Sequence, residues 1–174
     1  MLHAPTINLY YRGKGILKFD REDGNGLPTG LRHLGNAPDF TLSPIEESEK
    51  HYSSMEGVKT VDLEETLSRE LGGSFTLEEY DTKNLQLALL ADANPTFIRP
   101  MTSSNIVGKL DFWGMNNRGP RFHVELWRVK LKTTAKLEMI SDGIGQIAFE
   151  FTVLNDATNH SATPYGLITP IGQS

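Results

Sequence analysis

Residues 61–78 alternate apolar and polar side chains, and this alternation limits the chain to a β-rich fold. The apolar residues at odd positions are Val61, Leu63, Leu67, Leu71, Phe75 and Leu77. A period of two residues is typical of a β-strand with one face on a core, whereas an α-helix repeats about every 3.6 residues. We therefore predict a half-buried strand over this segment, with a bulge or tight bend at Gly72 and Gly73.

The second half of the chain has further strand patterns at residues 105–114, 120–134, 135–141 and 145–155. Within 120–134 the apolar parity changes after Leu126, which predicts a bulge near Leu126 and Trp127. Only residues 82–92 have a helical pattern, which Asp81 or Thr82 can cap. The sequence thus predicts a mainly β protein, an antiparallel β-sandwich or barrel-like sheet pair with one principal α-helix at about 82–92. It forms a single domain over residues 1–174.

Several kinds of chemistry have no signature in this chain. It has no cysteine, which excludes disulfides, thiolate metal sites and cysteine nucleophiles. Its histidines match no metal-binding spacing, and His123 and Glu125, two apart on a predicted strand, are expected to pair across a ladder. There is no serine nucleophile motif and no apolar run near the roughly 20 residues that span a bilayer. We therefore predict neither an enzyme nor a membrane protein, and no cofactor or metal.

Charge is distributed unevenly along the chain. Residues 39–81 contain twelve acidic and three basic residues, whereas the whole chain has a net charge of −5, so the remainder is net positive. Such asymmetry indicates that one face or edge is acidic and can meet a complementary surface, although an acidic solvated segment without a partner has the same pattern. Within the acidic segment, the polar stretch SPIEESEKHYSSMEG predicts a long loop at about 43–59. Loops of this length in a compact domain are usually functional or disordered.

Residues 34–92 resemble the tail tube (major tail) proteins of long-tailed bacteriophages. The resemblance rests on LGNAPDFTLSPIEE, HYSSMEG, the alternating strand pair and NLQLALL, which follow one another in that order. It implies a β-sandwich with a flanking helix, six copies closing into a ring whose inner sheets form a barrel, and rings stacked into the conduit for DNA. The helix end LLAD departs from the family pattern, and the C-terminal tail at about 155–174, expected to be extended, carries no motif of the family.

By this resemblance, the loop at about 43–59 is the arm that joins one ring to the next. Its candidate contact residues are Ile45, Glu46, Glu47, Glu49, Lys50, His51, Tyr52, Met55 and Glu56. The candidate basic residues that receive the arm are Lys14, Lys18, Arg118, Arg121 and Arg128. The candidate lumen-facing acidic residues are Asp62, Glu64, Glu70 and Glu78. Negative charge in the lumen would let DNA pass without binding, although these side chains could equally face the outside.

The resemblance also implies partners and a location. The partners are further copies of the chain, the tape-measure protein, the tail terminator and the tail-tip proteins, with transient, non-specific passage of DNA. The location is the tail of a virion, assembled in the host cytoplasm. We expect the non-contractile, siphovirus type of tail.

A different class of function is also open, a small apolar-ligand-binding β-barrel. In such a barrel, aromatic residues of the predicted strands would line a pocket. These residues are Trp113, Phe122, Trp127, Phe149 and Phe151. An alternating aromatic face is more often an ordinary core, so the tail tube hypothesis is preferred.

Overall fold

The computed structural model describes residues 5–53, 57–134 and 136–172. Its elements are η1 (Ile7–Leu9), β1 (Gly15–Arg21), β2 (Arg32–His33), β3 (Asp39–Ser53), β4 (Thr60–Leu77), α1 (Thr82–Ala88), β5 (Ile106–Gly114), β6 (Arg121–Thr133), β7 (Ile147–Val153) and β8 (Leu167–Ile171). The prediction of a mainly β fold with one α-helix is confirmed. Within the described ranges, no helix is long and apolar enough to cross a membrane.

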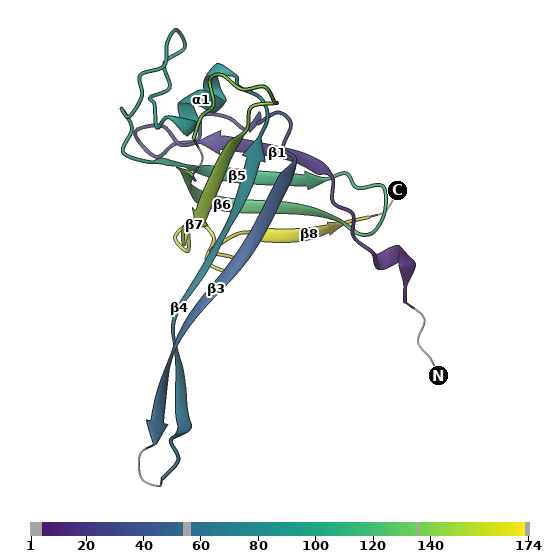
Figure 1. The fold of residues 1–174 in the computed structure, drawn as a ribbon, viewed down its shortest axis with the longest axis vertical. Coiled ribbons are helices and arrows are strands. Elements are labelled where there is room, and N and C mark those ends of the chain that lie inside the picture. The colour runs from purple at the N-terminus through teal and green to yellow at the C-terminus, as the bar shows by residue number, and fades with distance from the viewer. Residues whose placement is uncertain (1–4, 54–56, 135, 173–174) are drawn as a thin grey trace.

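All eight strands form one antiparallel sheet, ordered β2-β1-β5-β6-β7-β4-β3, with β8 beside β6. β6 joins two halves of this sheet, because one edge pairs with β5 while the other pairs with β8 over residues 121–125 and with β7 over residues 129–133. In Figure 1, β3, β4 and β7 cross obliquely in front of β1, β5, β6 and β8. The two halves therefore form the layers of a sandwich-like fold. The end strands β2 and β3 do not pair in the described part of the chain, so no barrel is closed.

The core lies between the two layers. Phe75 of β4 stacks on Phe149 of β7 with ring centroids 5.0 Å apart, and Phe40 of β3 packs against Phe112 of β5 at 5.1 Å. The largest fully buried residues come from both layers and include Leu17, Phe19, Leu110, Leu126, Phe75, Leu77, Ile147 and Phe149. Removing this apolar surface from water is the main force that holds the layers together.

A β-bulge in β6 lets both halves of this strand contribute to the core. The pairing with β5 shifts between Leu126 and Val129, so two residues of β6 lie opposite one residue of β5. Leu126 and Val129 are three positions apart, and both are buried as a result. The bulge predicted near Leu126 and Trp127 is therefore confirmed.

The bulge or bend predicted at Gly72 and Gly73 is wrong. β3 and β4 keep a continuous register there, with Leu42 opposite Gly73. The glycine is needed for close packing instead, since a Cβ at position 73 would lie 2.0 Å from the carbonyl oxygen of Thr41 and 2.6 Å from Cζ of Phe151. The pairing of β3 with β4 shifts further from the core, between residues 47 and 48 and between residues 51 and 52.

Helix α1 begins as predicted but ends earlier. Asp81 is the N-cap, and its Oδ1 accepts a hydrogen bond from the backbone N–H of Asn84. The helix was expected to reach residue 92 but ends at residue 88. The carbonyl oxygens of Leu89 and Leu90 accept hydrogen bonds from residues 101 and 103, and Leu90 has a φ of 49°. Hydrogen bonds from these distant backbone N–H groups thus replace the bonds of a further helical turn.

A buried asparagine fixes α1 to the sheet. Asn84 is fully buried, and its Nδ2 donates to the carbonyl oxygens of Leu34 and Glu79, both at 2.9 Å. Its Oδ1 accepts a hydrogen bond of 2.8 Å from Nη2 of Arg32. All polar atoms of this side chain therefore have partners, as a buried amide requires.

Two segments of the second half differ from their predictions. The strand predicted at 135–141 is not seen, because the described residues 136–146 form an irregular connection between β6 and β7. The tail predicted as extended over 155–174 instead makes turns and then forms β8, which pairs with β6 from Glu125↔Leu167 to Arg121↔Ile171. Residues 167–171 of the tail are thus a part of the sheet, and residues 173–174 lie outside the described residues.

The predicted loop at about 43–59 is wrong in conformation. β3 and β4 pair from Asp39↔Thr76 to Ser53↔Thr60, so residues 43–53 continue the strand. The segment resembles a loop in sequence because most of its side chains are polar on both faces. Backbone hydrogen bonds between two strands need no apolar side chains, and they hold this segment in a ladder.

The close approach at Gly73 leads to a stability prediction. We expect Gly73→Ala to lower the free energy of unfolding by about 1–3 kcal/mol, because the added methyl group overlaps backbone and ring atoms. The matched control is Gly24→Ala, since no atom lies within 4 Å of a Cβ placed there. Urea unfolding of both variants measures the difference, and equal midpoints would contradict the prediction.

Candidate functional site

The two longest strands project from the sandwich as an unsupported hairpin. β7 pairs with β4 only from Gly72 to Leu77, so within the described part of the chain residues 45–53 and 60–70 have no third strand beside them. We call these two segments the distal hairpin, which points away from the body in Figure 1. At about 3.3 Å per residue, it reaches roughly 30 Å beyond the sheet. A two-stranded hairpin on its own is marginally stable in water.

One face of the distal hairpin is balanced in charge. Its residues are Glu46, Ser48, Lys50, Glu64, Thr66 and Arg69. Glu46 accepts a hydrogen bond of 2.7 Å from the Thr66 hydroxyl and lies 3.6 Å from Nη2 of Arg69. Both contacts lower the pKa of Glu46, the hydroxyl more strongly. Glu64 accepts from Ser48 at 2.8 Å and lies 3.6 Å from Nζ of Lys50, so each acid on this face has a cation beside it.

The opposite face, which we call the acidic face, lacks such balance. Its charged residues are Glu47, Glu49, His51, Asp62, Glu65 and Glu70. Glu49 lies directly opposite Glu65 in the ladder, an arrangement that destabilises a β-sheet. His51 Nδ1 lies 2.7 Å from Oδ1 of Asp62. Neither lysine nor arginine lies on the described part of this face, so its carboxylates lack the neighbouring cations that the balanced face provides.

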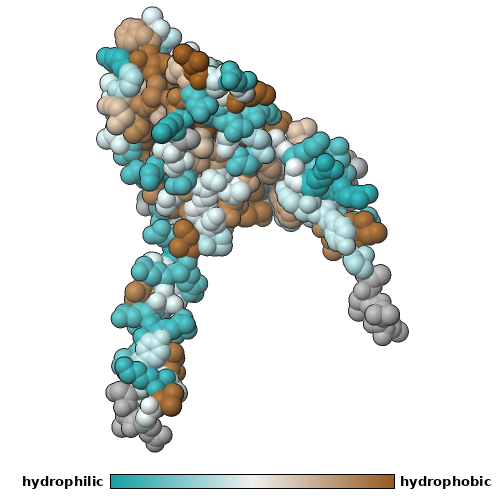
Figure 2. All heavy atoms as spheres, in the orientation of Figure 1, coloured by the Kyte–Doolittle hydropathy of each residue, from teal (hydrophilic) through white to brown (hydrophobic). Residues whose placement is uncertain are grey.

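Apolar side chains are exposed on both faces of the distal hairpin. The register shifts place Val61 opposite Tyr52 on the balanced face and Leu63 opposite His51 on the acidic face. Ile45, Leu63 and Leu67 are all more than half exposed. Figure 2 shows hydrophobic residues interspersed with hydrophilic ones along this projection. The strand predicted at 61–78 is confirmed, but its apolar face is buried only from the region of residue 71 onward.

The predicted arm residues lie on this hairpin. Ile45, Glu46, Glu47, Glu49, Lys50, His51 and Tyr52 belong to β3, whereas Met55 and Glu56 lie outside the described residues. Glu46 and Lys50 are on the balanced face, and Glu47, Glu49 and His51 are on the acidic face. The sequence identified the segment, and the structure adds the division into two faces.

The four candidate lumen residues do not lie on one surface of a single copy. Asp62 and Glu70 are on the acidic face, and Glu64 is on the balanced face. Glu78 lies after β4 at the other end of the strand, where it accepts hydrogen bonds from Asn36 and from Nε2 of Gln146. Strand parity grouped these residues, but the register shifts separate them.

The candidate basic residues also divide. Lys14 is beside the β5–β6 connection, because its carbonyl oxygen accepts from the N–H of residue 115 at 2.7 Å, and this connection contains Arg118. Arg121 starts the following strand and donates from Nε to the Asn116 carbonyl oxygen at 3.0 Å. Lys18 lies elsewhere, on β1, where it is opposite Asp111 of β5. Nε and Nη2 of Arg128 donate to the two carboxylate oxygens of Glu22 at 3.0 and 3.1 Å, so this cation already has an acidic partner.

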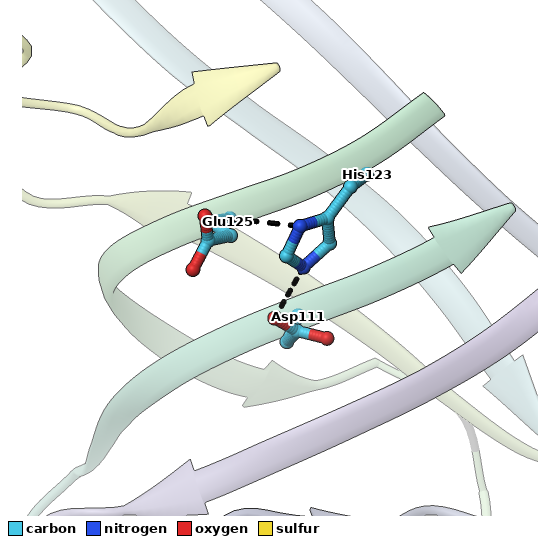
Figure 3. A group of neighbouring side chains, drawn as sticks. All are labelled: Asp111, His123 and Glu125. Atoms are coloured by element: carbon cyan, nitrogen blue, oxygen red, sulfur yellow. Dashed lines mark hydrogen bonds and ion pairs between the residues drawn. The ribbon is translucent and has the colours of Figure 1, made fainter. Parts of the chain in front are cut away.

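A cluster of Asp111, His123 and Glu125 lies on the outer face of β5 and β6 (Figure 3). Nε2 of His123 is 2.8 Å from Asp111 Oδ2, and Nδ1 is 3.8 Å from Glu125 Oε2. The ligand atoms that they offer a metal ion lie within 4.8 Å of one another. However, the carboxylates contact different nitrogens of the ring, and Lys109 binds Glu125 at 2.7 Å. We assign the cluster a structural role. His123 pairs across the ladder as expected, with Asp111 of β5 as its partner.

An apolar cleft lies at the end of the sandwich where β1 begins. It has a volume of about 610 Å³. Its apolar lining includes Leu17, Phe40, Phe112, Phe122, Val124 and Ile168, from β1, β3, β5, β6 and β8. No single strand pattern predicts this cleft, because it forms only where the two layers separate. The sequence analysis missed it for that reason.

The aromatic pocket of the ligand-binding hypothesis is not formed. Of its five residues, only Phe122 lines the cleft. Phe149 and Phe151 are buried in the core. Trp113 packs against His123 with ring centroids 4.5 Å apart, and Trp127 stacks on His160 at 4.1 Å. Strand alternation and the β6 bulge turn both tryptophans to the outer face.

Comparison with known proteins gives one family match. The family described as "Protein of unknown function UCP028589" matches the chain over residues 10–106 and 96–168. Among curated proteins, none matches the chain. Because the two matched segments together span most of the sequence, the chain belongs to the family of proteins of unknown function UCP028589.

Proposed function

We propose that this chain is the structural subunit of a bacteriophage tail tube, in which rings of six copies stack into the conduit for DNA delivery. The observation that carries the proposal is the distal hairpin, which exposes apolar and acidic side chains on a projection too thin to bury them. Exposed apolar patches mark interaction sites in soluble proteins. The sequence resemblance of residues 34–92 to tail tube proteins supports the same function.

The hairpin favours repeated assembly over a closed dimer. A projection that inserts into a different surface of the next copy makes a heterologous contact, and such contacts generate rings or open filaments. Both products are components of a stacked tube. Nothing in this function requires a catalytic group, a cofactor or a membrane.

The charge of the chain is compatible with a conduit. A net charge of −5 disfavours retention of phosphates, so DNA can move through an assembly of these subunits without binding. We propose Asp62, Glu64, Glu70 and Glu78 as contributors to the lumen. The proposed partners are further copies, the tape-measure protein, the tail terminator and the tail-tip proteins, in the tail of a virion assembled in the host cytoplasm.

Removing the distal hairpin tests the assembly role. Replacing residues 45–70 with Asn-Gly joins the paired residues Pro44 and Leu71 by a two-residue turn. We expect a folded monomer, because every core aromatic pair lies outside the deleted segment. Negative-stain images should show rings or tubes for the wild-type chain and none for the variant, with circular dichroism as the folding control. Normal tubes from the shortened chain would exclude the hairpin as the assembly arm.

The lumen assignment is tested at Glu70, which lies on the acidic face close to the body. We expect Glu70→Lys to slow DNA release from assembled particles, because added positive charges in a ring attract phosphates, and added salt should relieve the effect. The matched control is Glu70→Gln, which removes charge without creating a cation and should have a smaller effect. Unchanged release kinetics for the lysine variant at low salt would remove Glu70 from the lumen.

A further inference from the structure

The acidic face of the distal hairpin brings carboxylates together with no lysine or arginine on its described part. Glu49 and Glu65 are directly opposite each other, and Glu47 is the neighbouring acid on the same face. These side chains are exposed, so water solvates them in a free subunit. The exposed Leu63 lies on the same face, so the surface is acidic and apolar together. A matching surface must offer cations beside an apolar depression.

The same chain has such a surface at the end of the sandwich where β1 begins. The apolar cleft described above lies there, and both Lys14 and Tyr11 line it. Residues 10–14 pack against the β5–β6 connection, since a Cβ at Gly119 would lie 2.4 Å from the Tyr10 carbonyl oxygen. Of the cations on these two adjoining segments, Lys14 lines the cleft itself.

Three exposed cations belong to these segments, and we call them the basic rim: Arg12, Lys14 and Arg118. Residues 7–19 and 112–124 contain no acidic residue, so the rim is not neutralised by its own segments. Asp39 is the acidic residue that lines the cleft from β3. Within the described ranges, none of the three rim cations makes an ion pair with a carboxylate.

We infer that the part of the acidic face around Glu49, Leu63 and Glu65 docks on the apolar cleft and basic rim of a second copy. The lumen candidates Asp62 and Glu70 stay outside this contact. This inference rests on the proposed function, and it names the two surfaces that meet. Glu47, Glu49 and Glu65 supply the negative charge, and Leu63 supplies an apolar side chain for the cleft. The cations of the rim remove the repulsion between Glu49 and Glu65 when the surfaces join.

The geometry of this contact leads to continued addition of subunits. The hairpin and the cleft are different parts of the chain, so each copy can use both at once. The contact is electrostatic at its border, which makes it sensitive to salt. The balanced face stays outside this contact, because its acids already have cations beside them.

Charge reversal of both surfaces tests the inference in the full-length chain. The hairpin variant is E49K/E65K, the rim variant is K14E/R118E, and a third variant combines all four substitutions. We expect each double variant to raise the concentration needed for assembly by about tenfold or more, and the combined variant to restore assembly. Sedimentation velocity and negative-stain images at low salt measure the assembly, and circular dichroism verifies the fold.

Matched controls separate local pairing from net charge. E138K/D142K and K83E/K136E change the same number of charges at exposed positions outside the hairpin and the cleft, and we expect wild-type assembly from both. Combining E49K/E65K with K83E/K136E restores the net charge of −5 but not the complementarity. This variant should remain defective.

The outcomes distinguish the inference from the proposed function. Two results would overturn the docking while leaving the tail tube proposal intact. In the first, the wild-type chain forms tubes and the rim variant assembles normally. In the second, the combined variant folds but fails to assemble. A wild-type chain that stays monomeric at all concentrations would contradict the proposed function and the docking together. Assembly that depends on residues 5–11 but is unaffected by E49K/E65K would assign the cleft to the N-terminal segment and overturn the inference.

Discussion

The root of β4, where this strand is held between β3 and β7, is the constraint on which the rest of the structure depends. Phe75 stacks on Phe149 there, and Gly73 allows β3 and the Phe151 ring to approach β4 closely. A slip of one residue in this register would turn every side chain of β4 to the other face. The core thus determines which side chains the distal hairpin presents roughly 30 Å away.

Two register shifts convert one sequence pattern into two different surfaces. By parity alone, Val61 and Leu63 share a face with Phe75, but the shift beside His51 sends them to opposite faces. The same shifts gather Glu47, Glu49 and Glu65 on one side and leave the ion-paired Glu46 and Glu64 on the other. A strand with bulges can therefore have one charge-balanced face and one face with an excess of acidic side chains.

Sequence patterns predicted the strands β4, β5, β6 and β7, and tertiary contacts account for the errors. Alternation identified β4, and the parity change identified the β6 bulge, because both are local properties of one strand. The pairing of residues 43–53 was missed because it depends on a partner strand, not on their own polarity. The end of α1 depends on hydrogen bonds from residues 101 and 103, which are distant in sequence. The segment proposed as the arm lies on a projecting hairpin, whereas the cleft combines five strands, and no single one of them signals it.

The exposed outer edge of β3 has a consequence for the storage of unassembled subunits. Open edge strands are common starting points for aggregation, and natural proteins protect them with charge and proline. Two hairpins brought edge to edge would place Glu47 and Glu49 of both copies close together, and Pro44 lacks one backbone donor for such a ladder. Pairing of two such hairpins edge to edge is therefore disfavoured, which protects the free protein from aggregation at high concentration.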